Sequence, residues 1–378
     1  MKVSPKKQYD VCLVLLQSAV HDARTLNIAE SAVLLGKSVC VIALGTAEEQ
    51  KHIAATGISA YFLQCSPIGK LWKRWILFLW FAWHILRAIR VRQIWAEDVF
   101  CLPLCAVIAR LQSATLLYDS REIFSALGAL STHRIKQNII TWIERSCIGS
   151  VHTVIVSGQR DAEFLAEYFH REVPTVVMNV PKRTPHIRTS LLRDTYRIPA
   201  DQTILLYQGA VSHGRGILPV MKALPFIEHV VFCILGDGEQ KQEFMRFAEE
   251  NALNQRVFFC SKVPYHTLPQ WTASADIGLT IIEPISFSYS LALPNKLFEY
   301  AMAGLPVIAS SLPAIRDILD AVPFGLCVED FEPQTIAAVI KTMLEPNEYA
   351  QYRSQALHAR ECYAWEAQES ILQQLFSH

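Results

Sequence analysis

The sequence has no excess of charge of either sign, because 35 Lys and Arg residues balance 35 Asp and Glu residues in a chain of 378. A protein that binds nucleic acid through general electrostatic attraction carries a strongly basic surface. The balance therefore gives no support to nucleic-acid binding, and any basic patch has to be local.

Three sequence features are also missing. The ten cysteines lack the paired spacing of a zinc site or disulfide framework, and several lie in apolar runs such as residues 11–16, so we expect reduced core cysteines. The first residues, MKVSPKKQYD, lack the apolar stretch of a signal peptide, which predicts a cytoplasmic protein. Residues 15–26, after the first predicted strand, lack the G-x-G-x-x-G turn, which argues against a nicotinamide-dependent oxidoreductase.

One apolar run, Trp75–Trp83, is far shorter than the roughly 20 residues that span a bilayer. It belongs to residues 69–95, which are rich in tryptophan and basic residues and contain no acid. Such a helix suits the headgroup layer of the inner face of a membrane, because indole rings prefer the interface and each nearby cation adds about 1 kcal/mol. The alternative is a helix packed on the domain core with basic side chains at its rim. The predicted membrane-contact residues are Trp72, Trp75, Trp80, Trp83, Lys73 and Arg74.

Strand-like apolar runs alternate with helix-compatible segments, a pattern typical of a parallel sheet covered by helices on both faces. The first set of runs is 9–16, 38–44, 59–63, 93–96, 115–119 and 153–157. A polar, proline-containing stretch at 182–194 follows and is the best candidate for an interdomain linker. The pattern then restarts with runs at 203–208, 230–235, 256–260, 276–282, 306–310 and 325–329.

These two sets predict an α/β protein with two doubly wound, Rossmann-like domains that face each other across a cleft. The domains are residues 1–183 and 184–350, and a helical segment, residues 351–378, is expected to pack back toward the first domain. Open α/β sheets bind ligands at the carboxyl ends of their strands. We therefore expect the functional site where these strand ends meet.

Residues 291–310, LALPNKLFEYAMAGLPVIAS, hold the densest set of candidate binding groups. Leu293–Asn295 ends a loop and begins a helix, whose first N–H groups and positive dipole end suit a phosphate. Lys296 lies in the first turn and Glu299 lies three residues on along the same face, so a cation and a carboxylate can address one ligand. An ordinary capped helix with an ion pair is the alternative.

A second motif, LLYQGAVSHGRGILPVMKAL at residues 205–224, opens the second domain. Gly209 follows a predicted strand, and Gly214 and Gly216 let the backbone approach an anion closely. Arg215 between them supplies a fork of donors for phosphate. A glycine-rich turn with an exposed arginine is the alternative.

Together these segments resemble the donor-binding signature of the family 4 glycosyltransferases, a retaining family with the GT-B fold. The resemblance rests on residues 294–310, on the turn around Arg215 and on the strand and turn that hold Gly236, and it covers essentially all of the second domain. It implies that Lys296 contacts the donor diphosphate, that Glu299 holds the ribose hydroxyls and that Arg215 neutralises the leaving diphosphate. It also implies transfer from a nucleotide-diphosphate sugar with retention of configuration, and no metal or other cofactor.

The first domain resembles one branch of the same family more loosely, through residues 21–43 and 95–124. By position in these motifs, Asp98, Arg121 and Glu122 would face the acceptor, with Asp98 and Glu122 as candidate catalytic groups beside the cations of the second domain. The alternatives are a helix cap at Asp98 and a surface ion pair of Arg121 with Glu122.

Two positions depart from the family pattern. The donor loop of the family often carries a second glutamate where this chain has Leu291, and the first-domain motifs commonly carry histidine where this chain has Glu97 and Arg121. Arginine cannot accept a proton near neutral pH.

The predicted function is sugar transfer to a membrane-associated acceptor, lipid-linked or glycan. The alternative is a non-catalytic subunit of the same fold that supports a partner glycosyltransferase at the membrane.

Overall fold

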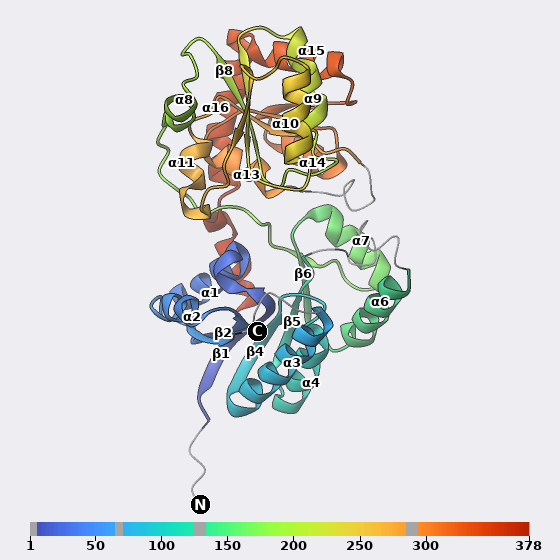
Figure 1. Cartoon of the computed structure of the whole chain (residues 1–378). Coiled ribbons are helices and arrows are strands. Elements are labelled where there is room, and N and C mark those ends of the chain that lie inside the picture. The colour runs from blue at the N-terminus through green and yellow to red at the C-terminus, as the bar shows by residue number, and fades with distance from the viewer. Residues whose placement is uncertain (1–5, 65–70, 122, 124–133, 285–292, 378) are drawn as a thin grey trace, which may run out of the picture. The chain divides into compact units, whose positions relative to one another are not determined.

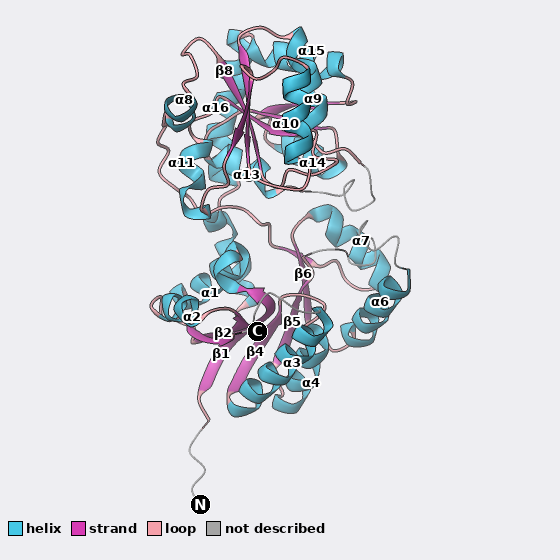
Figure 2. Cartoon of the chain, in the orientation of Figure 1, coloured by secondary structure: helices cyan, strands magenta, loops and turns pink. Residues whose placement is uncertain are grey.

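A computed structural model of the chain describes residues 6–64, 71–121, 123, 134–284 and 293–377. The chain divides into two compact units: unit 1 comprises Met1–Asn179 and Gln368–His378, and unit 2 comprises Val180–Ala367. Each unit is built on one parallel sheet that helices cover (Figures 1 and 2). The two parallel-sheet α/β domains predicted from the alternating sequence pattern are confirmed.

The sheet of unit 1 has the strand order β3-β2-β1-β4-β5-β6-β7, and neighbouring strands pair in parallel. The order reverses between β1 and β4, which is the position where open sheets of this kind bind ligands. The short β7 had no strand-like run in the sequence. The strands are β1 Gln8–Ser18, β2 Val39–Leu44, β3 Ser59–Leu63, β4 Arg90–Ala96, β5 Thr115–Asp119, β6 Thr153–Val156 and β7 Thr175–Val176.

The helices of unit 1 lie on two faces of this sheet because parallel crossovers are right-handed and the strand order reverses once. Turn η1 (Ala19–His21) leads into α1 (Ala23–Leu34), and α1 and α2 (Ala47–Ala54) cover one face. Helices α3 (Leu71–Ala88), α4 (Leu102–Gln112) and α6 (Arg134–Ile148) cover the other, where they share one apolar core with inward residues of β1, β2, β4 and β5. Helix α7 (Gln159–Phe169) joins β6 to β7.

Helix α17 (Glu369–Leu375) completes the first face of unit 1 after the chain has passed through unit 2. It packs against α1, and the buried side-chain amide of Gln93 donates a hydrogen bond to the Leu375 carbonyl at 2.9 Å. The Trp95 ring lies 5.3 Å from the Phe376 ring. Both β4 side chains are buried, so the core of unit 1 includes residues from the far end of the chain.

The sheet of unit 2 has the strand order β10-β9-β8-β11-β12-β13, again with parallel pairs and with its reversal between β8 and β11. The strands are β8 Thr203–Gln208, β9 Val230–Leu235, β10 Val257–Cys260, β11 Ile277–Thr280, β12 Val307–Ser310 and β13 Gly325–Val328. The described helices and 3-10 turns are α8 Leu191–Tyr196, α9 Ile217–Ala223, η3 Leu224–Phe226, α10 Lys241–Glu250, η4 Tyr265–Thr267, α11 Leu268–Thr272, α13 Asn295–Met302, α14 Pro313–Ala321, α15 Pro333–Leu344, α16 Pro346–Cys362 and η5 Trp365–Gln368.

The unit boundaries differ slightly from the expected domain boundaries. Unit 2 begins at Val180, a few residues before the expected position. Of the segment 351–378, helix α16 packs against α13 within unit 2, and only residues from Gln368 onward belong to unit 1. Aromatic packing explains this division, since the Tyr363 ring lies 5.3 Å from the Phe298 ring of α13.

The nine cysteines of the described segments are free thiols, and six of them are buried. This agrees with the expectation of reduced core cysteines. No helix in the described part of the chain is both long and apolar enough to cross a membrane.

Candidate functional site

The predicted donor residues of unit 2 lie at the carboxyl edge of its sheet, near the reversal of strand order. Gly209 directly follows β8 and Gly236 directly follows β9. Lys296 is the second residue of α13, and Glu299 lies about one turn further along the helix. The structure therefore brings together residues from three separate segments of the sequence at one edge of a single unit.

The ammonium group of Lys296 lies over an aromatic ring and beside a glycine. Its Nζ is 3.7 Å from the centre of the Tyr207 ring, and a Cβ atom on Gly209 would lie 3.5 Å from Nζ. Burial and the charge of Arg215 lower the pKa of Lys296 to about 7, against an opposing effect of Glu299. A bound anion would favour the protonated form, so this lysine is suited to hold a phosphate group.

The carboxylate of Glu299 is held in one orientation by the end of β8. The side-chain amide of Gln208 donates a hydrogen bond to Glu299 Oε2 at 2.5 Å, and the side-chain oxygen Oε1 of Gln208 accepts one from Thr272 Oγ1 at 2.8 Å. Burial raises the pKa of Glu299, although the amide and Lys296 lower it. A carboxylate fixed in this way can accept hydrogen bonds from ligand hydroxyls.

Glycines allow the loops at this edge to approach one another closely. A Cβ atom on Gly236 would lie 1.9 Å from the carbonyl oxygen of Gly209. The turn before α9 is braced by Glu283, whose N–H donates to the Gly214 carbonyl at 3.0 Å and whose carboxylate accepts from the Gly216 N–H at 3.3 Å. No local pattern in the sequence indicates this role of Glu283, because the residue follows β11 and contacts the turn only in the folded unit.

The first turn of α13 has no side-chain cap, since Pro294 precedes it. Asn295 is exposed and Leu293 is half-buried, while position 291 lies outside the described residues. Uncapped N–H groups at a helix start, with a lysine in the first turn, favour an anion. The edge thus combines two cations, a helix start and one oriented carboxylate, which is a suitable set for a phosphorylated, hydroxyl-bearing ligand.

The corresponding edge of unit 1 carries a buried cluster of charged side chains. Arg121 forms ion pairs with Asp22, Glu97 and Asp119, and the Arg121 side chain is 17% exposed. Arg24 forms a second, two-pronged pair with Asp119 at 2.7 and 2.8 Å. Two of the partners of Arg121, Asp22 and Glu97, are distant in the sequence, and the pairs differ from the surface pair considered above. Glu122 lies outside the described residues.

Burial changes the proton affinities within this cluster. It raises the pKa of Glu97 to about 8, with Asp119 and Asp22 acting in the same direction and Arg121 against it. For Asp119, burial is outweighed by Arg24 and Arg121, which lower its pKa. Among the described residues, Glu97 Oε1 is buried without a hydrogen-bond partner. Sequence reasoning missed Asp22, Arg24 and Asp119, whose roles depend on contacts between strands and helices.

Asp98 has the contacts of a backbone cap. Its carboxylate accepts hydrogen bonds from the N–H of Cys101 at 2.9 Å and from the N–H of Leu16 at 3.3 Å. Burial raises its pKa. The structure thus gives Asp98 the contacts of the capping alternative, in which it fixes the turn that leads into α4.

The predicted membrane residues of α3 fall into two groups. Trp72, Trp80 and Lys73 are exposed, whereas Arg74 and Trp83 are half-buried. The half-buried Trp75 donates from its indole to the Phe100 carbonyl at 2.9 Å. The strand β4 begins at Arg90, so the last part of the 69–95 stretch is not helical. Ile76 and Leu77 are exposed beside the two outer tryptophans.

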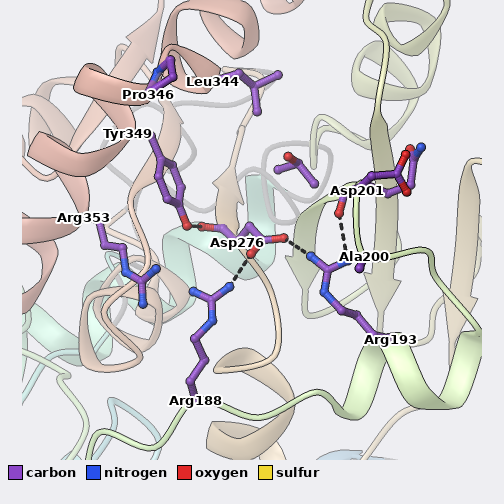
Figure 3. Close-up of a pocket in the computed structure, with 11 residues that line it drawn as sticks. Arg188, Arg193, Ala200, Asp201, Asp276, Leu344, Pro346, Tyr349 and Arg353 are labelled. Carbon is purple, nitrogen blue, oxygen red and sulfur yellow. Dashed lines mark hydrogen bonds and ion pairs between the residues drawn. The ribbon is translucent and has the colours of Figure 1, made fainter.

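A different pocket, of about 310 Å³, lies at the amino ends of β8 and β11 in unit 2 (Figure 3). Arg188 and Arg193 both point toward Asp276 and form ion pairs with it. The same carboxylate accepts a hydrogen bond from the Ile204 N–H at 2.9 Å. These contacts tie α8 and the preceding segment to the sheet, so we assign the pocket a structural role.

Among the described residues, no three His, Cys, Asp or Glu side chains are grouped to hold a metal ion.

Comparison with known proteins identifies a family that part of this chain resembles. Residues 202–346 match the family described as "Glycosyl transferases group 1". The chain is 26% identical over 158 residues to the putative colanic acid biosynthesis glycosyl transferase WcaI of Escherichia coli (strain K12), which covers 40% of this chain and 38% of that protein. It is 19% identical over 290 residues to 2-deoxystreptamine glucosyltransferase of Streptomyces kanamyceticus. That match covers 70% of this chain and 73% of the relative. The match with WcaI thus spans less than half of that relative.

Solved structures extend the likeness to both units. HepE of Anabaena, solved in complex with UDP and glucose, superposes with a TM-score of 0.75 at 14% identity over 98% of this chain and 99% of that one. Identity at this level shows the fold alone, which is the GT-B fold. The fold and the family resemblance inferred from the sequence are both confirmed.

Proposed function

Starting from a chain whose residues 202–346 form a group 1 glycosyltransferase domain, we propose that this protein transfers a sugar from a nucleotide-diphosphate sugar to an acceptor, with retention of anomeric configuration. Lys296 and Arg215 bind the diphosphate and Glu299 binds the ribose hydroxyls. A UDP-sugar is the first donor to test, because HepE was solved with UDP and glucose.

The observation that carries this proposal is the pairing of a half-buried lysine with an oriented carboxylate on one face of α13. Burial and the charge of Arg215 lower the pKa of Lys296 to about 7, and the negative charge of a diphosphate would favour the protonated lysine. Glu299 is already oriented by Gln208. Preorganised groups of this kind bind with little reorganisation.

In the proposed mechanism, cations stabilise the charge that develops on the leaving diphosphate. Fixed charges aimed at a developing anion usually provide the largest catalytic contribution. The acceptor hydroxyl gives its proton to the leaving phosphate, so the step does not require a side-chain base. This fits unit 1, where Arg121 lies among carboxylates and Asp98 binds backbone N–H groups.

The donor site is tested by thermal shift with UDP, GDP, ADP and TDP and their common sugars, on wild type and on Glu299→Ala. At a hundredfold excess over Kd, the selected nucleotide should stabilise the wild type by about 2.7 kcal/mol, and Glu299→Ala should lose most of that gain. The exposed Glu243→Gln on α10 is the matched control. If Glu299→Ala were stabilised by the nucleotide as much as the wild type is, Glu299 would not bind the ribose hydroxyls.

Turnover is tested with Arg215→Ala and Lys296→Ala, assayed with the selected donor. Both variants should lose sugar transfer while they keep the wild-type fold. Full turnover in either variant would refute its role in charge stabilisation.

The acceptor is proposed to be a lipid-linked sugar or glycolipid in an anionic membrane that α3 contacts. Trp72 and Trp80 are 55% and 61% exposed, and the Lys73 ammonium lies 5.6 Å from the Trp72 ring. Exposed tryptophan beside lysine is typical of helices that lie in the headgroup layer. The other face of α3 packs on the core through Phe78, Ala82 and Leu86, so core packing and lipid contact use opposite sides of one helix.

A second candidate function is a non-catalytic subunit that binds nucleotide sugar and supports a partner glycosyltransferase. The observation in its favour is that Arg121, at a position where the first-domain motifs commonly carry histidine, forms ion pairs with Asp22, Glu97 and Asp119. Purified protein that binds a nucleotide sugar but never consumes it, with acceptor lipid present, would favour this function over sugar transfer.

A further inference from the structure

Exposed apolar side chains are concentrated on three helices of unit 1. Sixteen large apolar residues are exposed in the described part of the chain, and nine of them lie on α3, α4 and α6. These helices have only 18, 11 and 15 residues. Single exposed apolar residues are normal on a protein surface, but a concentration of this kind marks a binding surface.

The three helices form a single layer. They pack on the same face of the sheet through one shared core, and α4 contacts both α3 and α6 (Figure 1). Helix α4 is therefore the middle member of the row. Their outward side chains belong to one continuous surface, which we call the α3–α4–α6 surface.

Helix α6 repeats the exposed pattern of α3. Ile135, Ile139 and Trp142 are 78%, 53% and 69% exposed, and their spacing of four and three residues places them on one stripe. Helix α4 adds Val107 and Leu111, which are four residues apart and also exposed. Each of the three helices thus turns an apolar stripe outward as well as an apolar face inward.

The exposed charges on this surface have one sign. The one acid in the sequence of these helices, Glu144, is buried and accepts a hydrogen bond from the Tyr118 hydroxyl at 2.7 Å. The exposed cations are Lys73, Arg87, Arg110, Lys136 and Arg145. On the other face of the sheet, α2 exposes both Glu48 and Lys51. The uniform charge is therefore a property of α3, α4 and α6, because α7, whose Phe169 packs against the same core, exposes Glu163 and Glu167.

We propose that the α3–α4–α6 surface binds the headgroup layer of an anionic phospholipid membrane, with α6 and α4 extending the contact proposed above for α3. The proposal rests on that contact and is independent of sugar transfer. A protein partner is less suitable, because interface cores are depleted in lysine and a complementary protein would have to supply only acids. Tryptophan with lysine and arginine, and no exposed acid, matches a negatively charged lipid interface.

The test is sedimentation of the full chain with vesicles of phosphatidylcholine and phosphatidylglycerol at a roughly 2:1 ratio, against phosphatidylcholine alone. The α6 variant carries Ile139→Ser and Trp142→Ser, and the α3 variant carries Ile76→Ser and Trp80→Ser. Their control carries Leu34→Ser and Leu35→Ser, which are exposed at the end of α1 on the opposite face. All six side chains are exposed, so the fold should persist, and the nucleotide thermal shift verifies that it does.

Each apolar variant should lower the partition coefficient on anionic vesicles by about tenfold or more, and the control should bind like wild type. Arg110→Glu with Lys136→Glu should weaken binding by roughly 25-fold or more, since each cation adds about 1 kcal/mol. That loss should shrink as salt is added. Lys51→Glu on α2 should have little effect.

Several outcomes overturn the proposal. Wild-type binding by the α6 variant, with loss in the α3 variant, would limit the contact to α3. Absence of binding to anionic vesicles would remove both contacts, and an unchanged nucleotide shift would show that the donor site stands regardless. If the wild type formed a dimer in solution and did not bind vesicles, and the α6 variant were monomeric, the surface would be assigned to a second copy of the chain.

Discussion

The two units share one sheet architecture, but the carboxyl edges of their sheets differ in charge. In unit 1, three carboxylates meet two guanidinium groups in buried ion pairs beside β4 and β5. In unit 2, the corresponding edge holds a buried lysine, Lys296, on which the charges of Arg215 and Glu299 act in opposite directions. Where buried charges are already paired, the loss of one partner is strongly destabilising, whereas a lysine in the first turn of a helix can hold an anionic ligand.

The largest expected effect breaks the paired edge. Arg24→Ala should lower the free energy of unfolding by about 3–5 kcal/mol, because the Asp119 carboxylate is left buried with half of its pairing. Denaturant unfolding measures the change. The control is Arg92→Ala, which removes an exposed pair with Asp10 and should cost less than about 1 kcal/mol. Equal costs for the two variants would mean that the buried pair contributes no more than a surface pair.

The next effect removes the lysine of the donor edge of unit 2. Lys296→Ala should lower kcat/KM for sugar transfer by about 10²–10³-fold, which is typical of the loss of one group that stabilises developing charge. The thermal midpoint should change little, because burial already disfavours the charged lysine. Steady-state kinetics with the selected donor provides the measurement, and Lys222→Ala on the exposed side of α9 is the control. A thermal loss as large as that of Arg24→Ala would contradict the contrast between the edges.

A smaller effect comes from the glycine packing behind the donor edge. Gly236→Ala places a methyl group where the Gly209 carbonyl lies, so the loop after β8 must shift. We expect a cost of about 1–3 kcal/mol in unfolding free energy and weaker nucleotide binding. Calorimetric titration with the selected nucleotide reports the binding change. Gly149→Ala meets no atom within 4 Å and should be neutral. If Gly236→Ala bound the nucleotide as tightly as the wild type does, the packing of Gly236 against Gly209 would have no part in donor binding.

The smallest effect is a change in pH dependence within the paired edge. Burial raises the pKa of Glu97 from its ordinary value of 4.5 to about 8, so the folded state holds this proton more tightly than the unfolded state. The contribution of Glu97 to stability is then complete below about pH 4.5 and is lost as pH rises to about 8. Relative to wild type, Glu97→Gln should gain stability across this range and level off above it. Denaturant unfolding at several pH values measures the trend, with Glu243→Gln as control; parallel curves would refute the raised pKa.

The fold was predictable because apolar runs mark each long strand. The runs at 115–119, 203–208 and 230–235 coincide with β5, β8 and β9. The two-residue β7 was missed because it is too short to produce a run. Local patterns also placed Lys296 and Glu299 together, since three residues on a helix share a face.

Other features of the site depend on contacts that no local pattern contains. Arg121 was considered as the partner of its neighbour in sequence, but its ion-pair partners are the N-cap residue of α1, the residue after β4 and the last residue of β5. Similarly, α6 gave no signal comparable to the tryptophans of α3, because its exposed stripe is evident only once its inward face is known. The roles of Lys296, Glu299 and Arg215 remain proposals that the variants above test.

The return of α17 to unit 1 has a consequence for folding during synthesis. On the ribosome, unit 1 emerges first, yet Gln93 and Trp95 lack their partners Leu375 and Phe376 until all of unit 2 has been translated. The nascent chain must therefore carry an unfinished first domain while the second domain folds. The order of translation and the order of completion are opposite in this protein, and slow elongation through unit 2 would prolong the exposure of an apolar β4 surface to chaperones.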